Sequence, residues 1–294
     1  MALSARTRLV ALALAAPLLL GGACGDQAEG VPAAQREAGD RFDSGRAFAD
    51  LRRQVALGPR PAGSEASRRL ADRLQREVPR GRFEEVPGGL RNVVGVLPGR
   101  GPAIVIAAHY DTKDIPGFVG ANDGASGTAA VLELSRVLRP SGARRGREVR
   151  FVFFDGEESP GPEESSDFLN EGVRGSRAYA KAHAAEIGAL VLLDFVGDKS
   201  LSLPHEEGSD PALWRQLRAA ARRAGVIEAF PGSSRPEILD DHTPFSQAGV
   251  PVIDLLDFPY HCFHRTCDNL SQVSARSLDK AGEAVAELVR GGIP

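Results

Sequence analysis

The stretch Ala103-Ile104-Val105-Ile106-Ala107-Ala108-His109-Tyr110-Asp111 decides the fold class, because a short apolar run passes directly into a polar segment. The run is rich in β-branched side chains, which is typical of a strand buried on both faces. In open α/β sheets the functional crevice lies beyond the carboxyl ends of the strands. The position of His109 and Asp111 therefore predicts that both belong to a functional site.

The same pattern recurs along the chain, and stretches with helical spacing alternate with it. The predicted strands are Asn92–Leu97, Ala103–Ala108, Val149–Phe154, Ala189–Leu193 and Val250–Leu256, and the predicted helices include Ser67–Leu74, Thr128–Leu138, Ser176–Ala184, Pro211–Ala224 and Ser274–Arg290. Strands that alternate with helices form a sheet covered by helices. We therefore predict an α/β fold: a three-layer α/β/α sandwich around a mixed, mostly parallel central sheet, in a single catalytic domain.

The composition excludes several classes of protein. The chain has 294 residues, 39 acidic and 36 basic side chains, and 3 cysteines. It is unlike a disordered tail, a collagen or a small disulfide-stapled domain. It also lacks the basic surplus that nucleic-acid binding requires, so we expect no nucleic-acid partner.

The first residues have the pattern of an export signal. Arg6 and Arg8 precede the apolar run Leu9–Leu20, which is shorter than the roughly 20 residues of a membrane-spanning helix. We therefore expect residues 1–23 to be a signal peptide and the protein to be exported, periplasmic or extracellular.

The segment after the signal is predicted to connect it to the catalytic domain. Cys24 follows small residues and fits a lipidated lipoprotein start, which would attach the protein to a membrane, although Gly21 stands where a lipobox has an aliphatic residue. Residues 24–45 are predicted to form a flexible tether and residues 46–294 the catalytic domain.

Acidic and imidazole side chains follow several of the predicted strands. They are His109 and Asp111 after the strand at 103–108, Asp155, Glu157 and Glu158 after the strand at 149–154, Asp194 after the strand at 189–193, His264 after the last strand, and Asp123 in the turn Gly120–Gly124. We expect these side chains to converge on one rim of the sheet, where they make a ligand set of the kind that zinc prefers.

The spacing of these residues along the strands suits particular chemical roles. His109 and Asp111 point the same way on extended backbone, which would let Asp111 accept the second ring N–H of His109. Glu157 and Glu158 are adjacent, so their side chains diverge on extended backbone, and one can bind a metal while the other carries a proton.

The order of the motifs resembles that of metallopeptidase family 28, most of all its glutaminyl cyclase branch. The resemblance rests on His109-Tyr110-Asp111, Gly120–Gly127, Phe154-Asp155-Gly156-Glu157-Glu158, Gly175-Ser176-Arg177, Leu193-Asp194 and Asp240–Phe245, and it covers nearly everything after residue 46. It implies that Asp123, Glu158 and His264 bind zinc, with Glu157 as the general base or acid.

The resemblance leaves the number of zinc ions open. In dinuclear aminopeptidases of the family, His109 and Asp194 would hold a second zinc ion, with Asp123 bridging the two. In the cyclases one zinc ion is bound, and Asp194 joins Glu157 and Asp240 in a hydrogen-bonded acidic network. We therefore expect one zinc ion for a cyclase and two for an aminopeptidase.

Details beside the motifs favour the cyclase. Asp240-Asp241-His242 is similar to the cyclase motif, and Val252-Ile253-Asp254 resembles bacterial cyclases, whereas animal cyclases carry His where Asp254 stands. Against this, Phe263 stands where cyclases usually have Trp, and it is expected to line the substrate pocket. The sole tryptophan, Trp214, is expected to pack within its helix.

We therefore predict a zinc-dependent glutaminyl-peptide cyclotransferase, which converts the N-terminal Gln of peptides or proteins to pyroglutamate and releases ammonia. The alternative is a zinc-dependent aminopeptidase that hydrolyses N-terminal residues, and a non-catalytic binding protein on the same scaffold is a third hypothesis. Asp111, His242 and Asp254 are expected to support the site without binding metal.

The cysteines near His264 allow two interpretations. Cys262 and Cys267 could form a metal cluster with the histidine between them, but a local disulfide is favoured in an exported protein. The sequence predicts no oligomeric state.

Overall fold

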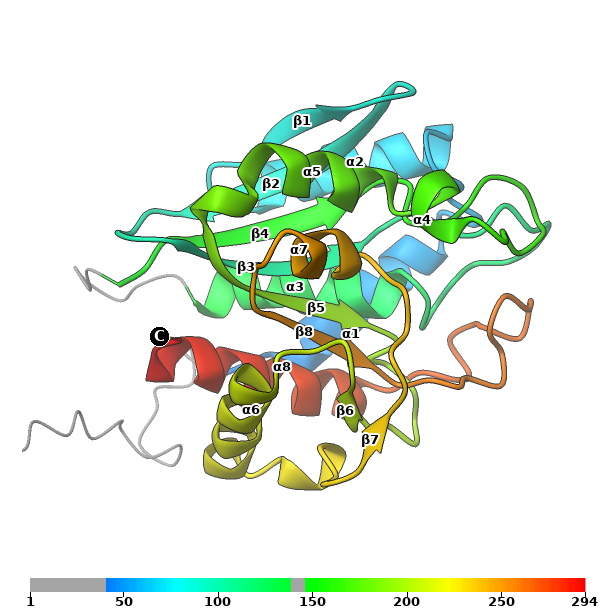
Figure 1. Cartoon of the computed structure of the whole chain (residues 1–294). Helices are drawn as coiled ribbons and strands as arrows, with labels where there is room; N and C mark the ends of the chain where they lie inside the picture. The colour runs from blue at the N-terminus through cyan, green and yellow to red at the C-terminus, as the bar shows by residue number, and fades with distance from the viewer. Residues whose placement is uncertain (1–40, 139–145, 294) are drawn as a thin grey trace, which may run out of the picture. The chain divides into compact units, whose positions relative to one another are not determined.

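The computed structural model describes residues 41–138 and 146–293, which form a central sheet with helices on both faces (Figure 1). The strands of this six-stranded sheet are β1 (Arg82–Val86), β2 (Leu90–Leu97), β3 (Ala103–His109), β4 (Val149–Phe154), β5 (Ile187–Asp194) and β8 (Val252–Leu256). Two short strands, β6 (His205–Glu206) and β7 (Ser234–Arg235), pair with each other outside it.

The helices alternate with the strands along the chain. They are α1 (Ser44–Val55), α2 (Glu65–Glu77), α3 (Ala125–Val137), α4 (Phe168–Glu171), α5 (Arg174–His183), α6 (Pro211–Ala224), α7 (Thr243–Gln247) and α8 (Ala275–Gly291), with 3-10 turns η3 (Ala184–Glu186) and η4 (Ile227–Ala229). Each predicted helix has a counterpart among them, and the short helices α4 and α7 were not predicted.

The sheet is mixed, as predicted, with the order β1-β2-β4-β3-β5-β8. Strands β4, β3, β5 and β8 run parallel, whereas β1 and β2 add antiparallel pairs on one side. The sequence pattern missed β1 because Arg82–Val86 lies at the sheet edge and is mostly polar and partly exposed. An apolar run is the mark of a buried strand, and β1 has none.

Side chains of the central strands alternate between two cores. Ile104 and Ile106 face a core formed with α1, α2, α3, α6 and α8, while Val105 and Ala107 face a core formed with α5 and α7. In Figure 1, α5 and α7 lie in front of the sheet and α1 and α3 behind it. The predicted three-layer sandwich is therefore confirmed, with unequal helical cover on its two faces.

The folded domain begins earlier than residue 46. Phe42 is buried, its ring fills the space where Gly282 of α8 has no side chain, and α1 begins at Ser44. The boundary expected for the tether is therefore wrong by a few residues, because a single aromatic anchor carries no periodic signal. The predicted signal peptide and Cys24 lie outside the described residues. Within the described ranges, no helix is long and apolar enough to cross a membrane.

Candidate metal centre

Three parallel strands bring the predicted site residues to one edge of the sheet. His109 ends β3, Asp194 ends β5, and Glu157 and Glu158 follow the end of β4. Because β3 pairs in parallel with both β4 and β5, these strand ends lie side by side. All four residues are at most 9% exposed, so water reaches their charges poorly.

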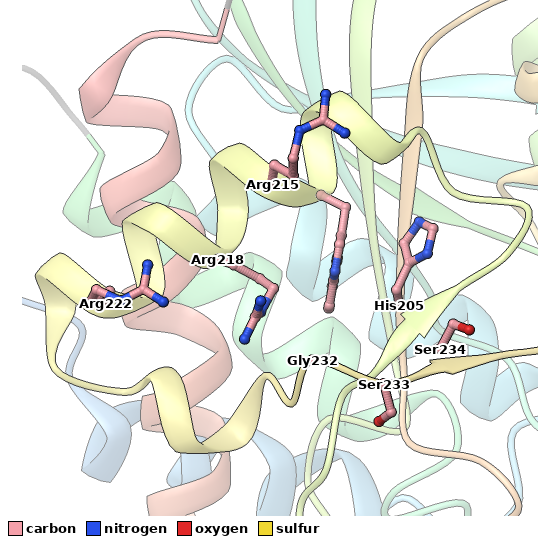
Figure 2. Close-up of a pocket in the computed structure, with 8 residues that line it drawn as sticks. His205, Arg215, Arg218, Arg222, Gly232, Ser233 and Ser234 are labelled. Carbon is pink, nitrogen blue, oxygen red and sulfur yellow. The ribbon is translucent and has the colours of Figure 1, made fainter.

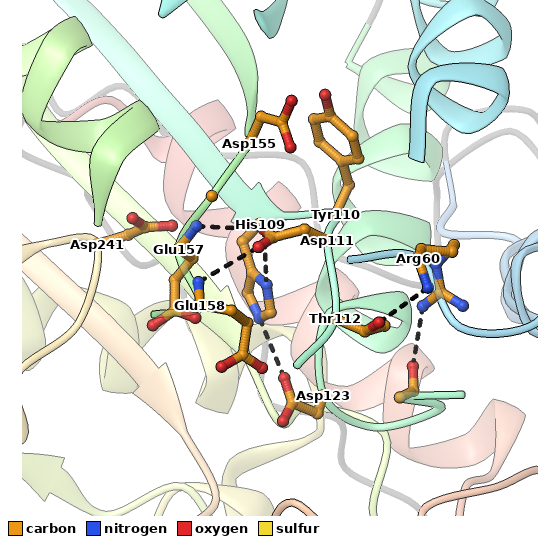
Figure 3. Close-up of polar contacts among 12 residues, drawn as sticks. Arg60, His109, Tyr110, Asp111, Thr112, Asp123, Asp155, Glu157, Glu158 and Asp241 are labelled. Atoms are coloured by element: carbon orange, nitrogen blue, oxygen red, sulfur yellow. Dashed lines mark hydrogen bonds and ion pairs between the residues drawn. The ribbon is translucent and has the colours of Figure 1, made fainter. Parts of the chain in front are cut away.

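Asp111 holds the turn that carries the two glutamates. Its Oδ1 accepts the backbone N–H of Glu157 (3.2 Å), and its Oδ2 accepts that of Glu158 (3.3 Å) (Figure 3). His109 Nδ1 lies 3.6 Å from Asp111 Oδ1, which is an ion-pair contact slightly longer than a hydrogen bond. Asp111 therefore fixes the backbone of the turn and also faces the ring of His109, as the spacing predicts.

A second acid, Asp268, fixes the loop that presents Asp123. Its carboxylate oxygens accept the backbone N–H groups of Asn122 (2.8 Å) and Asp123 (3.0 Å). Gly124 follows with a φ of +81°, and a Cβ there would lie 2.6 Å from the carbonyl oxygen of Asp111. This position accepts glycine without strain and no residue with a side chain.

Two groups of candidate metal ligands share Asp123. One is His109, Asp123 and Asp194, the other is Asp123, Glu158 and His264, and the ligand atoms in each lie within 4.8 Å of one another. His109 Nε2 is 3.3 Å from Asp123 Oδ1 and 3.3 Å from Asp194 Oδ1. His264 Nε2 is 3.3 Å from Glu158 Oε1 and 3.5 Å from Asp123 Oδ2.

The second of these groups fits a bound cation. Asp123 Oδ2 and Glu158 Oε1 are buried and accept no hydrogen bond from the described residues. Buried carboxylate oxygens without partners are costly, and a cation held by Asp123, Glu158 and His264 would satisfy both. Two carboxylates and one imidazole are ligand types that zinc takes.

The loop around His264 is braced by local contacts. Cys262 and Cys267 form a disulfide that closes the loop. Glu164 Oε1 pairs with Nδ1 of the histidine, which leaves Nε2 to face the carboxylates of the metal group. A partner on the second ring nitrogen fixes the orientation of a histidine ligand.

Aromatic rings lie beside the histidine. Phe263 stacks on His264 with ring centroids 3.9 Å apart, and it also contacts Phe258 (5.1 Å) and Phe195 (6.0 Å). Phe263 is only partly buried, so this apolar cluster borders the metal group and retains an exposed side. Trp214 lies elsewhere, on α6, where it packs against Phe230.

Glu157 belongs to neither group at Asp123. Burial raises the pKa of Glu157 well above the usual carboxyl range, the charge of His109 opposes this, and Glu158 reinforces it. Burial likewise raises the pKa of Asp240 well above its usual range, with Asp194 adding to the effect. We call the buried acids gathered here the acidic rim: Asp111, Asp123, Glu157, Glu158, Asp194 and Asp240. A buried carboxyl that binds no metal is suited to carry a proton.

His242 and Asp254 lie together in a third group, with Glu206. His242 Nδ1 is 3.5 Å from Asp254 Oδ2, and its Nε2 is 3.8 Å from Glu206 Oε2. Burial lowers the pKa of His242 to about 4, so the ring is neutral at neutral pH. Burial, followed by the charge of Asp240, raises the pKa of Asp254 well above its usual range. This group therefore borders the acidic rim through Asp240.

Three contributing residues were missed from the sequence. Lys113 is buried, its Nζ donates to the carbonyl oxygen of Ser159 (3.1 Å) and lies 3.9 Å from Glu158 Oε2. A lysine two residues after Asp111 was a usable signal for a charge near the site. Asp268 and Glu164 offered no such signal, because their partners are remote in sequence or lie in an irregular loop.

The model of Peptidase family M28 matches residues 92–289. The chain belongs to peptidase family M28. This M28 protein is 28% identical over 249 residues to the glutaminyl-peptide cyclotransferase of Bos taurus, an alignment that covers 70% of this chain and 68% of the relative.

Solved structures agree with this assignment. The glutaminyl cyclase of an Acidobacteriales bacterium is similar at a TM-score of 0.74 and 31% identity, covering 91% of this chain and 98% of its own. A Zn-dependent exopeptidase from Parabacteroides distasonis is similar at a TM-score of 0.75 and 25% identity, covering 86% and 99%. The M28 protein is therefore an enzyme, and its family and ligand groups indicate zinc as the cofactor.

Proposed function

We propose that this M28 protein is a zinc-dependent glutaminyl-peptide cyclotransferase, which converts the N-terminal Gln of a peptide or protein to pyroglutamate with release of ammonia. The observation that carries the proposal is the placement of Glu157, a buried carboxyl beside the candidate zinc ligands but outside both ligand groups. Cyclisation requires such a group because a proton must move from the attacking nitrogen to the departing one.

The proposed reaction occurs within one substrate molecule. The α-amine nitrogen attacks the carbonyl carbon of the Gln side-chain amide, the new bond closes the ring, and the amide C–N bond breaks to release ammonia. Glu157 takes a proton from the attacking nitrogen and gives it to the leaving nitrogen. Zinc held by Asp123, Glu158 and His264 would supply Lewis-acid polarisation of the amide carbonyl. Intramolecular attack gains from proximity.

We propose a single zinc ion, because Asp123 Oδ2 and Glu158 Oε1 in the group with His264 accept no hydrogen bond from the described residues, whereas Asp194 Oδ1 in the group with His109 already accepts the backbone N–H of Phe195 (2.9 Å). Burial lowers the pKa of His109, but the carboxylates of Asp194, Asp111 and Asp123 outweigh burial and raise it well above its usual value. A protonated His109 pairs with both Asp123 and Asp194. Asp194 then binds no metal, and its charge acts on the neighbouring carboxyl of Asp240.

A zinc-dependent aminopeptidase is the second candidate, and the group of His109, Asp123 and Asp194 favours it. A hydrolase would use both groups at Asp123 to hold two zinc ions, and Glu157 would take a proton from an attacking water. The exopeptidase among the similar structures is consistent with this alternative.

One experiment separates these functions. The purified protein is offered a Gln-initiated peptide, a Leu-initiated peptide, and the Gln-initiated peptide with its α-amine acetylated. Cyclisation releases ammonia and lowers the mass by one NH3 for the first peptide alone. Release of a free amino acid from the first two peptides would establish hydrolysis instead. Counting zinc per chain in the same preparation gives one ion for the proposed enzyme and two for the hydrolase, and a protein with no zinc and no turnover would be a binding protein.

We also propose that the protein is exported and attached to a membrane through lipidated Cys24. The apolar run Leu9–Leu20 and the small residues before Cys24 support this. Expression of the whole chain in a bacterium with labelled fatty acid should label the protein and place it in the membrane fraction. Label retained by the Cys24→Ala variant would contradict the proposal.

A further inference from the structure

A cavity of about 420 Å³ lies between α6 and the segment at 232–234, away from the metal centre (Figure 2). Its lining includes Arg215, Arg218, Arg222, Ser233 and Ser234. None of these residues takes part in the proposed reaction. Its volume falls within the usual range for small-molecule sites. We call it the arginine pocket.

The three arginines share one face of α6. Positions 215, 218 and 222 are spaced by three and four residues, which places them in a row along a helix. Among the described residues, none of the three has an ion pair with a carboxylate, whereas Arg223 of the same helix pairs with Glu287 (2.9 Å). The pocket therefore concentrates unneutralised positive charge on a chain whose formal net charge is -3.

The rest of the pocket is held in place by packing and backbone contacts. Trp214 is 6% exposed and packs against His205 with ring centroids 5.5 Å apart. Arg218 Nε donates to the carbonyl oxygen of Phe230 (3.1 Å), which fixes this guanidinium near Gly232. The backbone N–H of His205 donates to the carbonyl oxygen of Ser233 (3.1 Å), which ties the 232–234 segment to β6.

We propose that the arginine pocket binds a phosphate-bearing polyanion. Planar guanidinium groups match phosphate oxygens in paired hydrogen bonds, and several of them favour a ligand with more than one negative charge. Ser233 lines the opposite wall, while the hydroxyl of Ser234 is already bonded to Glu207 (3.1 Å). The phosphate can belong to a free molecule or to a lipid headgroup, and the chemistry of recognition is the same.

The test uses the whole zinc-loaded protein and isothermal titration calorimetry with sodium pyrophosphate. We expect one bound pyrophosphate per chain and an affinity that falls with added salt. The Arg215→Gln/Arg222→Gln double variant should bind roughly tenfold more weakly or worse, as expected for loss of hydrogen bonds to charged groups. Both side chains are exposed, so the variant should keep its fold, which its melting temperature verifies. The matched control is Arg69→Gln, an exposed arginine on α2 that should leave binding unchanged.

A second arm identifies the source of the phosphate. Sedimentation of the Cys24→Ala chain, which carries no acyl group of its own, with phosphatidylcholine vesicles that contain phosphatidic acid tests a lipid headgroup. Arg215→Gln/Arg222→Gln in this background should release the protein from the vesicles. Binding in either arm that depends on these arginines supports the proposal and names the source. Pyrophosphate binding that survives the double variant belongs to the metal centre and overturns it. So does equal weakening by Arg69→Gln, or binding of neither probe.

Discussion

The acidic rim and the arginine pocket each bring side chains of one charge together, but the rim is buried and the pocket is largely exposed to solvent. The acids of the rim are buried, and backbone N–H groups and histidines partly compensate them. Two of the pocket's arginines, Arg215 and Arg222, are exposed, and water can solvate them. Buried charges of one sign are strongly destabilising unless a bound cation or protons neutralise them. Exposed charges of one sign are solvated by water, so they destabilise the ligand-free protein only slightly. The rim should therefore control stability and chemistry, and the pocket should control binding with little effect on stability.

The largest effect is expected from Glu157→Gln. Glutamine keeps the shape of the side chain but cannot carry the proton, so turnover of the Gln-initiated peptide should fall about 10²- to 10⁴-fold. Zinc content should not change, because Glu157 lies outside both ligand groups. Steady-state rates and zinc analysis check both statements. The matched control is Glu163→Gln, an exposed carboxyl in the neighbouring loop that should keep full activity. A variant that is inactive because it has lost zinc would assign Glu157 to the metal instead.

Removal of zinc should destabilise the protein more at pH 8 than at pH 5. Burial, then Asp123, raises the pKa of Glu158 to about 7, and burial raises that of Asp241 to about 7. Between the ordinary pKa of these carboxyls and pH 7, the folded metal-free protein keeps protons that the unfolded chain releases. Its free energy of unfolding therefore falls as pH rises. Zinc replaces the proton on Glu158, and at a hundredfold excess over its dissociation constant it contributes about 2.7 kcal/mol.

Melting temperatures with and without EDTA at the two pH values check this effect. Burial lowers the pKa of His264, but Glu158 outweighs burial and raises it to about 9. The stability that the His264 proton contributes to the metal-free protein is therefore also lost as pH rises, up to about pH 9. A metal-free protein that melts higher at pH 8 than at pH 5 would show that the acids of the rim are compensated without a cation.

A pair of glycine substitutions compares the backbone of the two regions. Gly124→Ala should destabilise by about 1–3 kcal/mol, because φ is +81° and a Cβ would lie 2.6 Å from the carbonyl oxygen of Asp111. Gly232→Ala in the pocket should change stability by at most about 1 kcal/mol, in the stabilising direction, since its Cβ would meet only Arg218 Nη2 at 3.8 Å. Chemical denaturation measures both values. Equal losses would mean that the pocket backbone is as constrained as the rim.

The two regions also differ in how far the sequence predicts them. Apolar runs identified β2, β3, β4, β5 and β8, and parallel pairing brings the polar residues after such strands together without further information. Hence the grouping of His109, Glu157, Glu158 and Asp194 could be anticipated. The partners of Asp111 and Asp268 could not, because any backbone N–H group can donate to a nearby carboxylate, and such a contact leaves no mark in the sequence.

The arginine pocket could not be anticipated at all. In the sequence, a row of arginines on α6 indicates only an ordinary solvated helix face. The 232–234 segment comes to lie opposite these arginines only in the folded protein. The edge strand β1 and the anchor Phe42 were missed for a similar reason. Both depend on one tertiary neighbour rather than on a periodic pattern.

The smallest predicted effect has the opposite sign from those in the rim. Arg215 and Arg218 lie three residues apart on α6, so their charges repel, and Arg215→Gln should stabilise the protein by about 0.2–0.5 kcal/mol at low salt. Salt screens exposed charges, so the gain should vanish near 1 M NaCl, where the Debye length is about 3 Å. Urea denaturation of the variant and the parent at both salt concentrations measures the difference. A loss of stability at low salt would reveal a partner for Arg215 and remove the contrast between an open pocket and a compensated rim.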